Sequence, residues 1–116
     1  MKKDDIIYVG HIFDLAQGIT RRLIGRTRAD YDADEDLRIV LAHLVQNIGE
    51  AARRVSREFQ AAHPEIPWGE MIGMRHRIVH DYMDIDYDIV WDVVTLELPR
   101  LIEKIAPLVP PEENQP

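Results

Sequence analysis

The segment around which this chain is organised reads Met74-Arg75-His76-Arg77-Ile78-Val79-His80-Asp81-Tyr82. Within it, Arg75 and His80 have the spacing Arg-x-x-x-x-His, and Tyr82 follows His80 at the second residue. A permanent cation, an imidazole and a nucleophilic hydroxyl therefore lie close together in a pattern that is otherwise apolar. Catalytic and phosphate-binding sites use groups of this kind, so Arg75, His76, His80 and Tyr82 are the candidate site residues.

We expect this segment to belong to a helix over residues 67–82. At about 100° per residue, His76 and His80 share one stripe of such a helix, whereas Arg75 and His80 are offset by roughly 140°. One helix alone therefore directs Arg75 and His80 to different places. A second copy across a two-fold axis would bring these groups to a shared cleft, which predicts a homodimer. The alternative is an arginine and a histidine that are simply solvated on a surface helix.

The pattern Arg75-His76-x-x-x-His80-x-Tyr82 resembles the signature of the HEPN superfamily. The surrounding sequence resembles its HepT branch in four further stretches, which are Asn47-Ile48-Gly49-Glu50-Ala51-Ala52, His63-Pro64-Glu65-Ile66-Pro67-Trp68, Ile72-Gly73-Met74-Arg75 and Ile89-Val90-Trp91. The likeness covers most of the chain. Two positions depart from many relatives, because His76 stands where they have Asn and Asp81 stands where they have Gly. A carboxylate beside His80 would change the titration of the imidazole or weaken phosphate binding.

The resemblance implies an all-α, HEPN-like fold and an endoribonuclease toxin whose composite active site lies at the interface of a homodimer. It implies catalytic roles for Arg75 and His80, support from His76 and Tyr82, and no cofactor. It also implies a type II-like toxin-antitoxin pair. In such a pair, an MntA-like minimal nucleotidyltransferase neutralises the toxin by transferring AMP to the motif tyrosine, here Tyr82.

The residue chemistry suits RNA cleavage without a metal ion. His80 can take a proton from a ribose 2′-hydroxyl or give one to the leaving oxygen, and Arg75 can stabilise charge on the pentavalent phosphate. Tyr82 or His76 would orient the scissile group. Since one histidine cannot easily serve as base and acid together, the second copy across the dimer axis would supply the missing partner.

Two alternatives stay open. His76 and His80 have the i, i+4 spacing of a metal-ligand pair, but no Glu follows His76 as in the zinc-protease motif, so a third ligand must come from elsewhere. In the second alternative the chain is a non-catalytic helical dimer that only docks to a nucleotidyltransferase. Arg75 and His80 would then bind a nucleotide or serve only as charged groups that stabilise the structure. An RNase assay separates the docking module from the enzyme.

Composition indicates one small domain. The 116 residues are 46% hydrophobic and 30% charged, with no cysteine and no apolar run near the roughly 18 residues of a membrane span. We expect a single domain over residues 1–109, a polar proline-rich tail over 110–116, a cytoplasmic location and no membrane partner. The net charge of −7 argues against broad capture of a nucleic-acid backbone, so we expect no DNA partner and only local RNA contact.

Arginines nevertheless cluster at three places, where they could form a basic groove or merely balance nearby carboxylates. The clusters are Arg21, Arg22, Arg26 and Arg28; Arg53, Arg54 and Arg57; and Arg75 and Arg77.

The apolar periodicity predicts an antiparallel four-helix bundle with short connections and no strands. We expect helices over residues 5–24, from Asp32 or Asp34 to about Ala62, over 67–82 and over 86–108, with a non-helical connection at 26–32. Pro99 is expected to kink the fourth helix.

The second predicted helix carries two special features. Its small residues Gly49, Ala51 and Ala52 predict the close approach of a neighbouring backbone. Its polar stripe is predicted to line the cleft that receives His80, unless it is only a solvated face. That stripe consists of His43, Asn47, Glu50 and Arg54.

Overall fold

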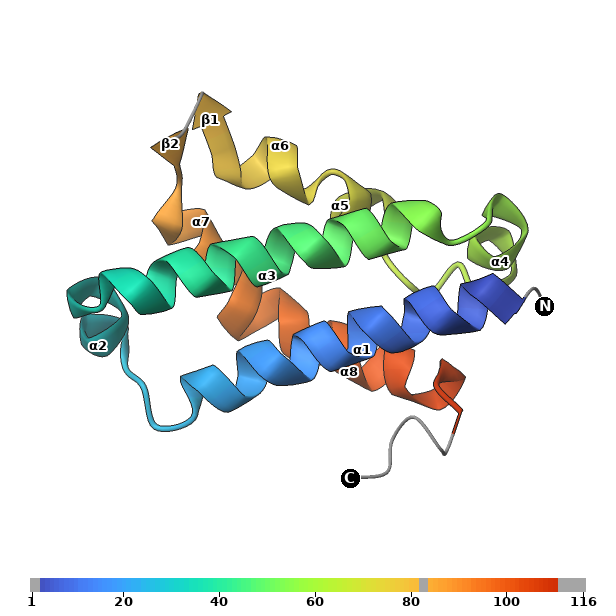
Figure 1. Ribbon diagram of the computed structural model, residues 1–116, viewed down its shortest axis with the longest axis horizontal. Helices are drawn as coiled ribbons and strands as arrows, with labels where there is room; N and C mark the ends of the chain where they lie inside the picture. Colours follow the sequence, from blue (N-terminus) through green and yellow to red (C-terminus); the bar gives the residue numbers. More distant parts are fainter. Residues whose placement is uncertain (1–2, 82–83, 111–116) are drawn as a thin grey trace.

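The computed structural model describes residues 3–81 and 84–110. Two long helices, α1 (Lys3–Leu23) and α3 (Glu35–Arg54), run antiparallel side by side, and the C-terminal segments α7 (Tyr87–Asp92) and α8 (Leu98–Ile105) cross them on one face (Figure 1). The mostly helical structure agrees with the predicted all-α class. The four-helix count and the homodimer remain predictions. No helix in the described ranges is long and apolar enough to span a membrane.

Helix α1 forms where its apolar stripe predicts it. Val9, Ile12, Ala16 and Ile19 are each fully buried, since three-four spacing places them on one face. The helix ends before Gly25, whose φ of 73° lies in the left-handed region that glycine adopts without strain. The predicted first helix is therefore confirmed.

The connection predicted at 26–32 is wrong, because most of it forms the short helix α2 (Arg28–Ala33). Thr27 and Asp30 make a capping box, in which each side chain accepts a hydrogen bond from the other's backbone N–H. The ring of Tyr31 is buried, and its hydroxyl donates to the carbonyl of Tyr87 at 2.7 Å. Burial raises the pKa of Tyr31 to about 12. This tertiary contact holds α2 against α7.

The long second helix predicted to reach Ala62 is also wrong in its length. Helix α3 ends at Arg54, and a separate helix α4 (Arg57–Ala62) begins after Ser56. Ser56 caps α4, because its Oγ accepts from the N–H of Phe59 at 3.1 Å. The buried carboxylate of Asp5 accepts from the backbone N–H and the hydroxyl of Ser56, at 2.7 and 2.8 Å. A long-range contact with α1 therefore fixes the break.

Gly49 lies where α5 (Trp68–Ile72) comes closest to α3. A Cβ added at Gly49 would lie 2.5 Å from the carbonyl oxygen of Met71, which is closer than side-chain carbons approach backbone oxygens. This confirms the predicted close approach of a neighbouring backbone at the small residues.

The helix predicted over 67–82 is interrupted and ends early. Helix α5 stops at Ile72, Gly73 separates it from α6 (Met74–Ile78), and the chain continues as strand β1 (Val79–Asp81). Strand β1 pairs antiparallel with β2 (Asp84–Ile85), so the prediction of no strands is wrong. The backbone N–H of Asp86 donates to the carbonyl of Ile78 at 2.6 Å, which holds the base of the hairpin to the end of α6.

This ending places His80 on a strand and not on a helix. The prediction that His76 and His80 share one stripe of a helix is therefore wrong. The prediction of a helical offset between Arg75 and His80 is wrong for the same reason. Tyr82 lies outside the described residues. The predicted tail also lies outside them from residue 111 onward.

The fourth predicted helix is confirmed in extent but is irregular. Between α7 and α8 the chain forms a π-helical turn, η1 (Val93–Glu97), and it ends in a 3-10 turn, η2 (Ala106–Leu108). The N–H of Leu98 donates to the carbonyl of Val93, five residues earlier. Pro99 follows directly, and a proline without an N–H is a common reason for such a departure from α-helical bonding.

Candidate functional site

Arg75 lines a polar hollow between α3 and the α5–α6 segment. This hollow, called here the α3–α6 hollow, has a volume of about 520 Å³ and is lined by His43, Gln46, Asn47, Gly49, Glu50, Arg53, Ile72 and Arg75. The side chain of Arg75 is exposed in the first turn of α6. It forms no hydrogen bond or ion pair with the residues that the structure describes, so its guanidinium is available to a ligand.

His80 is held by a carboxylate that sequence reasoning did not connect to it. Its Nε2 lies 2.8 Å from Oδ2 of Asp86, and its side chain is 53% exposed. Oδ1 of Asp86 caps α7 by accepting from the N–H groups of Asp88 and Ile89, each at 3.1 Å. The Ile89 N–H and then His80 lower the pKa of Asp86 below its ordinary value. The sequence predicted that Asp86 could cap the following helix. The contact between Asp86 and His80 could not be predicted, because the β1–β2 hairpin brings the two residues together.

Arg75 and His80 do not contact each other within one described chain. Arg75 lies at the α3–α6 hollow, whereas His80 lies on the hairpin against Asp86. His76 is exposed on α6 between them. The catalytic assignment of Arg75 and His80, with support from His76 and Tyr82, stays a prediction.

The metal-ligand alternative loses its geometric basis. It required one helix to carry His76 and His80 one turn apart, and α6 ends at Ile78. Over residues 3–81 and 84–110, no three His, Cys, Asp or Glu side chains gather in a group that could hold a metal ion.

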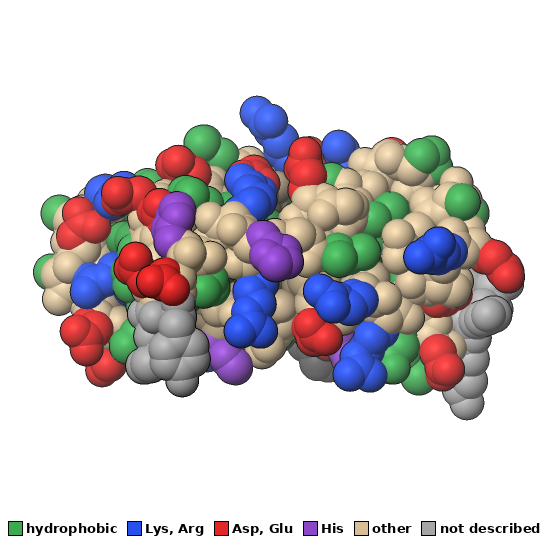
Figure 2. Space-filling view, turned by 90° about the horizontal axis from the view of Figure 1, so that it is seen from above, with side chains coloured by type: hydrophobic (Ala, Val, Ile, Leu, Met, Phe, Trp, Pro, Cys, Tyr) green, Lys and Arg blue, Asp and Glu red, His purple; other side chains and the backbone are tan. Residues whose placement is uncertain are grey.

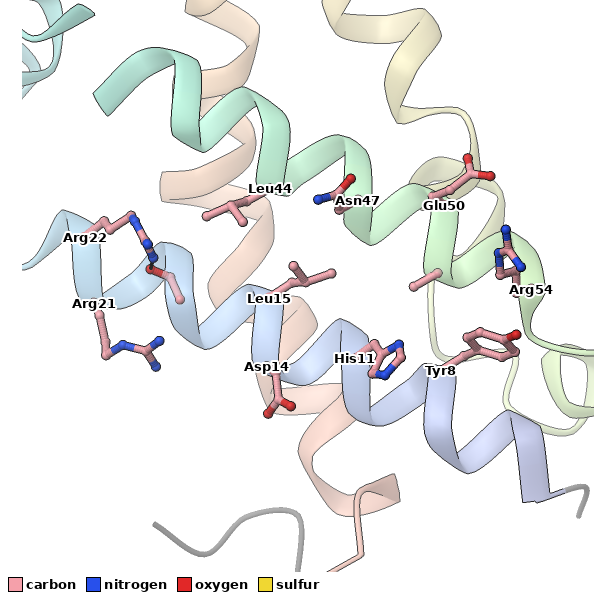
Figure 3. A pocket seen from close by; sticks show the side chains of 12 residues that line it. Tyr8, His11, Asp14, Leu15, Arg21, Arg22, Leu44, Asn47, Glu50 and Arg54 are labelled. Carbon is pink, nitrogen blue, oxygen red and sulfur yellow. Dashed lines mark hydrogen bonds between the residues drawn. The ribbon is translucent and has the colours of Figure 1, made fainter. Parts of the chain in front are cut away.

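The predicted polar stripe of α3 divides between two hollows. His43 lines the α3–α6 hollow, Arg54 lines a groove of about 620 Å³ between α1 and α3, and Asn47 and Glu50 line both. Figure 3 shows this second groove, with Tyr8 and other side chains of α1 facing those of α3. The stripe therefore reaches Arg75, and His80 is not in the lining of either of these two hollows.

Arg77 fixes the motif helix in place. Its guanidinium forms two hydrogen bonds, of 2.8 and 2.7 Å, with the carboxylate of Glu97 in η1. Arg77 lowers the pKa of Glu97, and the planar two-point contact restrains the orientation of α6 and hence of Arg75. Of the predicted basic pair, Arg77 is thus structural, and Arg75 alone is left to a ligand. The sequence contained no signal for this long-range pair.

The face that carries α5, α6 and the hairpin is mixed in charge. Figure 2 shows Lys, Arg and His side chains across its middle, with carboxylates both among them and toward its ends. Local positive charge on a chain of net charge −7 agrees with the expectation that any nucleic-acid contact is local.

Comparison with known proteins decides the family. The sequence model of the family described as Ribonuclease HepT-like matches residues 12–108. The chain belongs to the HepT-like ribonuclease family. Membership confirms the resemblance drawn from the Arg75 to Tyr82 motif, and it confirms the enzyme class that goes with it.

Individual HepT-like relatives support the assignment. A Thermococcus cleftensis protein named as a probable ribonuclease HepT is 29% identical over 106 residues, which are 91% of this chain and 94% of that protein. A Caldanaerobacter subterraneus protein, named provisionally as an RNase, is 28% identical over 106 residues, 91% of this chain and 95% of its own.

A longer relative comes from Methanocaldococcus jannaschii. It is named as a gamma-glutamylcyclotransferase and, provisionally, an RNase, and it is 29% identical over 109 residues. The match covers 94% of this chain but 49% of that protein. No solved structure matches the HepT-like chain significantly.

Proposed function

We propose that this HepT-like chain is a metal-independent endoribonuclease that acts in the cytoplasm as the toxin of a toxin-antitoxin pair. The observation that carries the proposal is the Arg75 to His80 motif in a member of a ribonuclease family, with Arg75 at a polar hollow and without an ion-pair partner among the described residues. The RNA substrate follows from the family, whereas the toxin role, the partner and the metal independence extend beyond it.

The contact with Asp86 selects one tautomer of the neutral His80 imidazole. Because the lowered pKa of Asp86 keeps its carboxylate ionised at neutral pH, Oδ2 can only accept a hydrogen bond, and Nε2–H of His80 must donate it. In the neutral imidazole this leaves Nδ1 as the acceptor. Nδ1 can therefore take the proton from a ribose 2′-hydroxyl.

The proposed reaction is transesterification within the RNA. The 2′-oxygen bonds to the adjacent phosphorus as its proton passes to His80, and the bond from phosphorus to the 5′-oxygen breaks. The leaving oxygen takes up a proton, and the products are a 2′,3′-cyclic phosphate and a 5′-hydroxyl. Arg75 stabilises the extra charge on the pentavalent phosphate. We expect a second chain to supply the group that protonates the leaving oxygen, because one histidine cannot easily serve as base and acid together.

The function is tested by incubating purified protein with single-stranded RNA in excess EDTA. We expect cleavage to persist and to yield cyclic-phosphate ends, and the active species to sediment as a dimer of the 13.5 kDa chain. Loss of cleavage in EDTA with rescue by a divalent metal would contradict metal independence. A protein that binds a nucleotidyltransferase but never cleaves RNA would instead be the docking module.

Asp86→Asn is expected to lower kcat for RNA cleavage by about 100-fold, because it reverses the hydrogen bond to His80. The amide would still accept from the α7 backbone but would donate to Nε2, which moves the imidazole proton to Nδ1 and removes the base. Asn caps helices about as well as Asp, so the melting temperature should change little. Steady-state kinetics check this, and an unchanged kcat would contradict the orienting role.

Tyr82 is proposed as the site at which a minimal nucleotidyltransferase switches the toxin off. An attached AMP would place phosphate charge next to the motif and compete with the RNA phosphate. Co-expression with the cognate partner, followed by peptide mass spectrometry, should find AMP on Tyr82 and not on Tyr8, Tyr31 or Tyr87. Tyr82→Phe should escape inhibition completely. AMP on another tyrosine alone, or full inhibition of Tyr82→Phe, would show that the partner acts by a different route.

A further inference from the structure

The α3–α6 hollow contains a second arginine that the motif does not include. Arg53, in the last turn of α3, lines it together with Arg75 of α6, and His43 lies about three turns earlier on the same helix. Glu50 is the one carboxylate among the residues that line this hollow. In the described chain neither arginine is paired with Glu50 or with any other group, whereas Arg26, Arg28 and Arg77 all bond to carboxylates.

The two arginines are held on opposite walls by rigid elements. At Gly49 the backbone of α5 packs directly against α3, so the distance between the walls is fixed by close contact. The bidentate pair of Arg77 with Glu97 restrains α6, which carries Arg75. The hollow's volume of about 520 Å³ lies in the range of about 300 to 1,000 Å³ that ligand sites occupy.

The chemistry of this hollow suits a phosphodiester. Guanidinium groups donate paired hydrogen bonds to phosphate oxygens, and two of them without a carboxylate partner favour an anionic ligand. Asn47 is half-buried in the same lining, and no hydrogen bond to its side-chain amide occurs in the part of the chain that the structure describes. An amide can both donate to and accept from a ribose or a base.

We propose that the α3–α6 hollow is the RNA-binding subsite next to the scissile phosphate, in which Arg53 contacts the phosphate of a neighbouring nucleotide. Asn47 then forms a hydrogen bond with the sugar or base of that nucleotide. Arg75 lies between this subsite and the scissile phosphate. The proposal rests on the proposed function, because it takes single-stranded RNA as the substrate. It adds Arg53 as a binding residue that affects affinity and leaves the chemical step unchanged.

The test measures binding of a mixed-sequence 2′-O-methyl oligoribonucleotide, which lacks the attacking hydroxyl and cannot be cleaved. Arg53→Ala should weaken binding by about 10-fold, the loss typical of a charge-assisted hydrogen bond. It should also lower the slope of log affinity against log salt by about 0.7, the value for one phosphate contact on a single strand. On cleavable RNA the same variant should raise KM and leave kcat within about two-fold.

Matched variants separate a specific contact from a change in net charge. Arg57→Ala removes the same charge from an exposed position at the start of α4, outside the lining of this hollow, and should bind RNA like the wild type. Arg53→Lys keeps a point charge and should retain the salt slope while it recovers part of the affinity.

Three results would overturn the proposal. RNA binding and sedimentation of Arg53→Ala could both equal those of the wild type, Arg53→Ala and Arg57→Ala could weaken binding equally, or Arg53→Ala could change the sedimentation coefficient and leave RNA binding intact. The last result would make the hollow a contact between copies of the chain. If the wild type binds the oligonucleotide through Arg53 but cleaves no RNA, the subsite stands and the proposed function fails.

Discussion

His80→Ala and Arg75→Ala are each expected to lower RNA cleavage by about 100-fold or more, the effect of deleting a general acid or base or a transition-state charge partner. Both side chains are exposed, Arg75 makes no side-chain hydrogen bond or ion pair with the described residues, and His80 makes a single exposed contact with Asp86. Helicity and melting temperature should therefore stay close to the wild type. Cleavage rates on a labelled RNA, measured beside circular dichroism, check both parts.

The controls for this pair remove the same chemical groups elsewhere. Arg57→Ala deletes an exposed arginine, and His11→Ala deletes an exposed histidine of α1, so both should retain full activity. Full cleavage by both His80→Ala and Arg75→Ala would show that the chemistry lies elsewhere in the chain.

Gly49→Ala is expected to cause a large loss of stability, because the new methyl group would meet the carbonyl oxygen of Met71 at 2.5 Å. Helix propensity alone predicts a gain of about 1 kcal/mol for this change. Overpacking against a backbone atom should outweigh that gain and lower the free energy of unfolding by about 2 kcal/mol net. The melting temperature should fall by roughly 10 °C.

Gly69→Ala provides the matched comparison. Gly69 lies in α5, and beyond its chain neighbours and its own helix backbone no described atom lies within 4 Å of a Cβ added there, so alanine should leave the stability unchanged or raise it by up to about 1 kcal/mol. In thermal melts, only Gly49→Ala is therefore expected to lower the melting temperature. A Gly49→Ala protein as stable as Gly69→Ala would mean that α5 can move away from α3 at little cost.

The family and the main helices could be predicted from local pattern. The three-four apolar spacing of α1 is a property of neighbouring residues, and a helix buries such a stripe wherever it packs. The motif Arg75 to Tyr82 likewise identified the HepT-like family without coordinates, because the motif is a matter of residue type and spacing. The small residues near Gly49 indicated close packing for the same reason.

The helix breaks could not be predicted, because contacts between distant residues cause them. Asp5 binds the backbone and hydroxyl of Ser56, 51 residues away, and so fixes the point at which α3 gives way to α4. Tyr31 becomes buried because its hydroxyl reaches the carbonyl of Tyr87. Apolar periodicity depends only on neighbouring residues. The prediction based on it therefore continued one helix through Ser56 and placed Tyr31 in a non-helical connection.

The sequence by itself determined that this is a helical HepT-like ribonuclease with Arg75 and His80 as its candidate groups. Only the tertiary structure decided where those groups lie. It ended the motif helix at Ile78, placed His80 on a strand against Asp86, and brought Arg75 and Arg53 to the lining of the same α3–α6 hollow. The physical reason is that residue type and spacing fix which chemistry is present, whereas long-range hydrogen bonds and close packing fix the direction of each side chain.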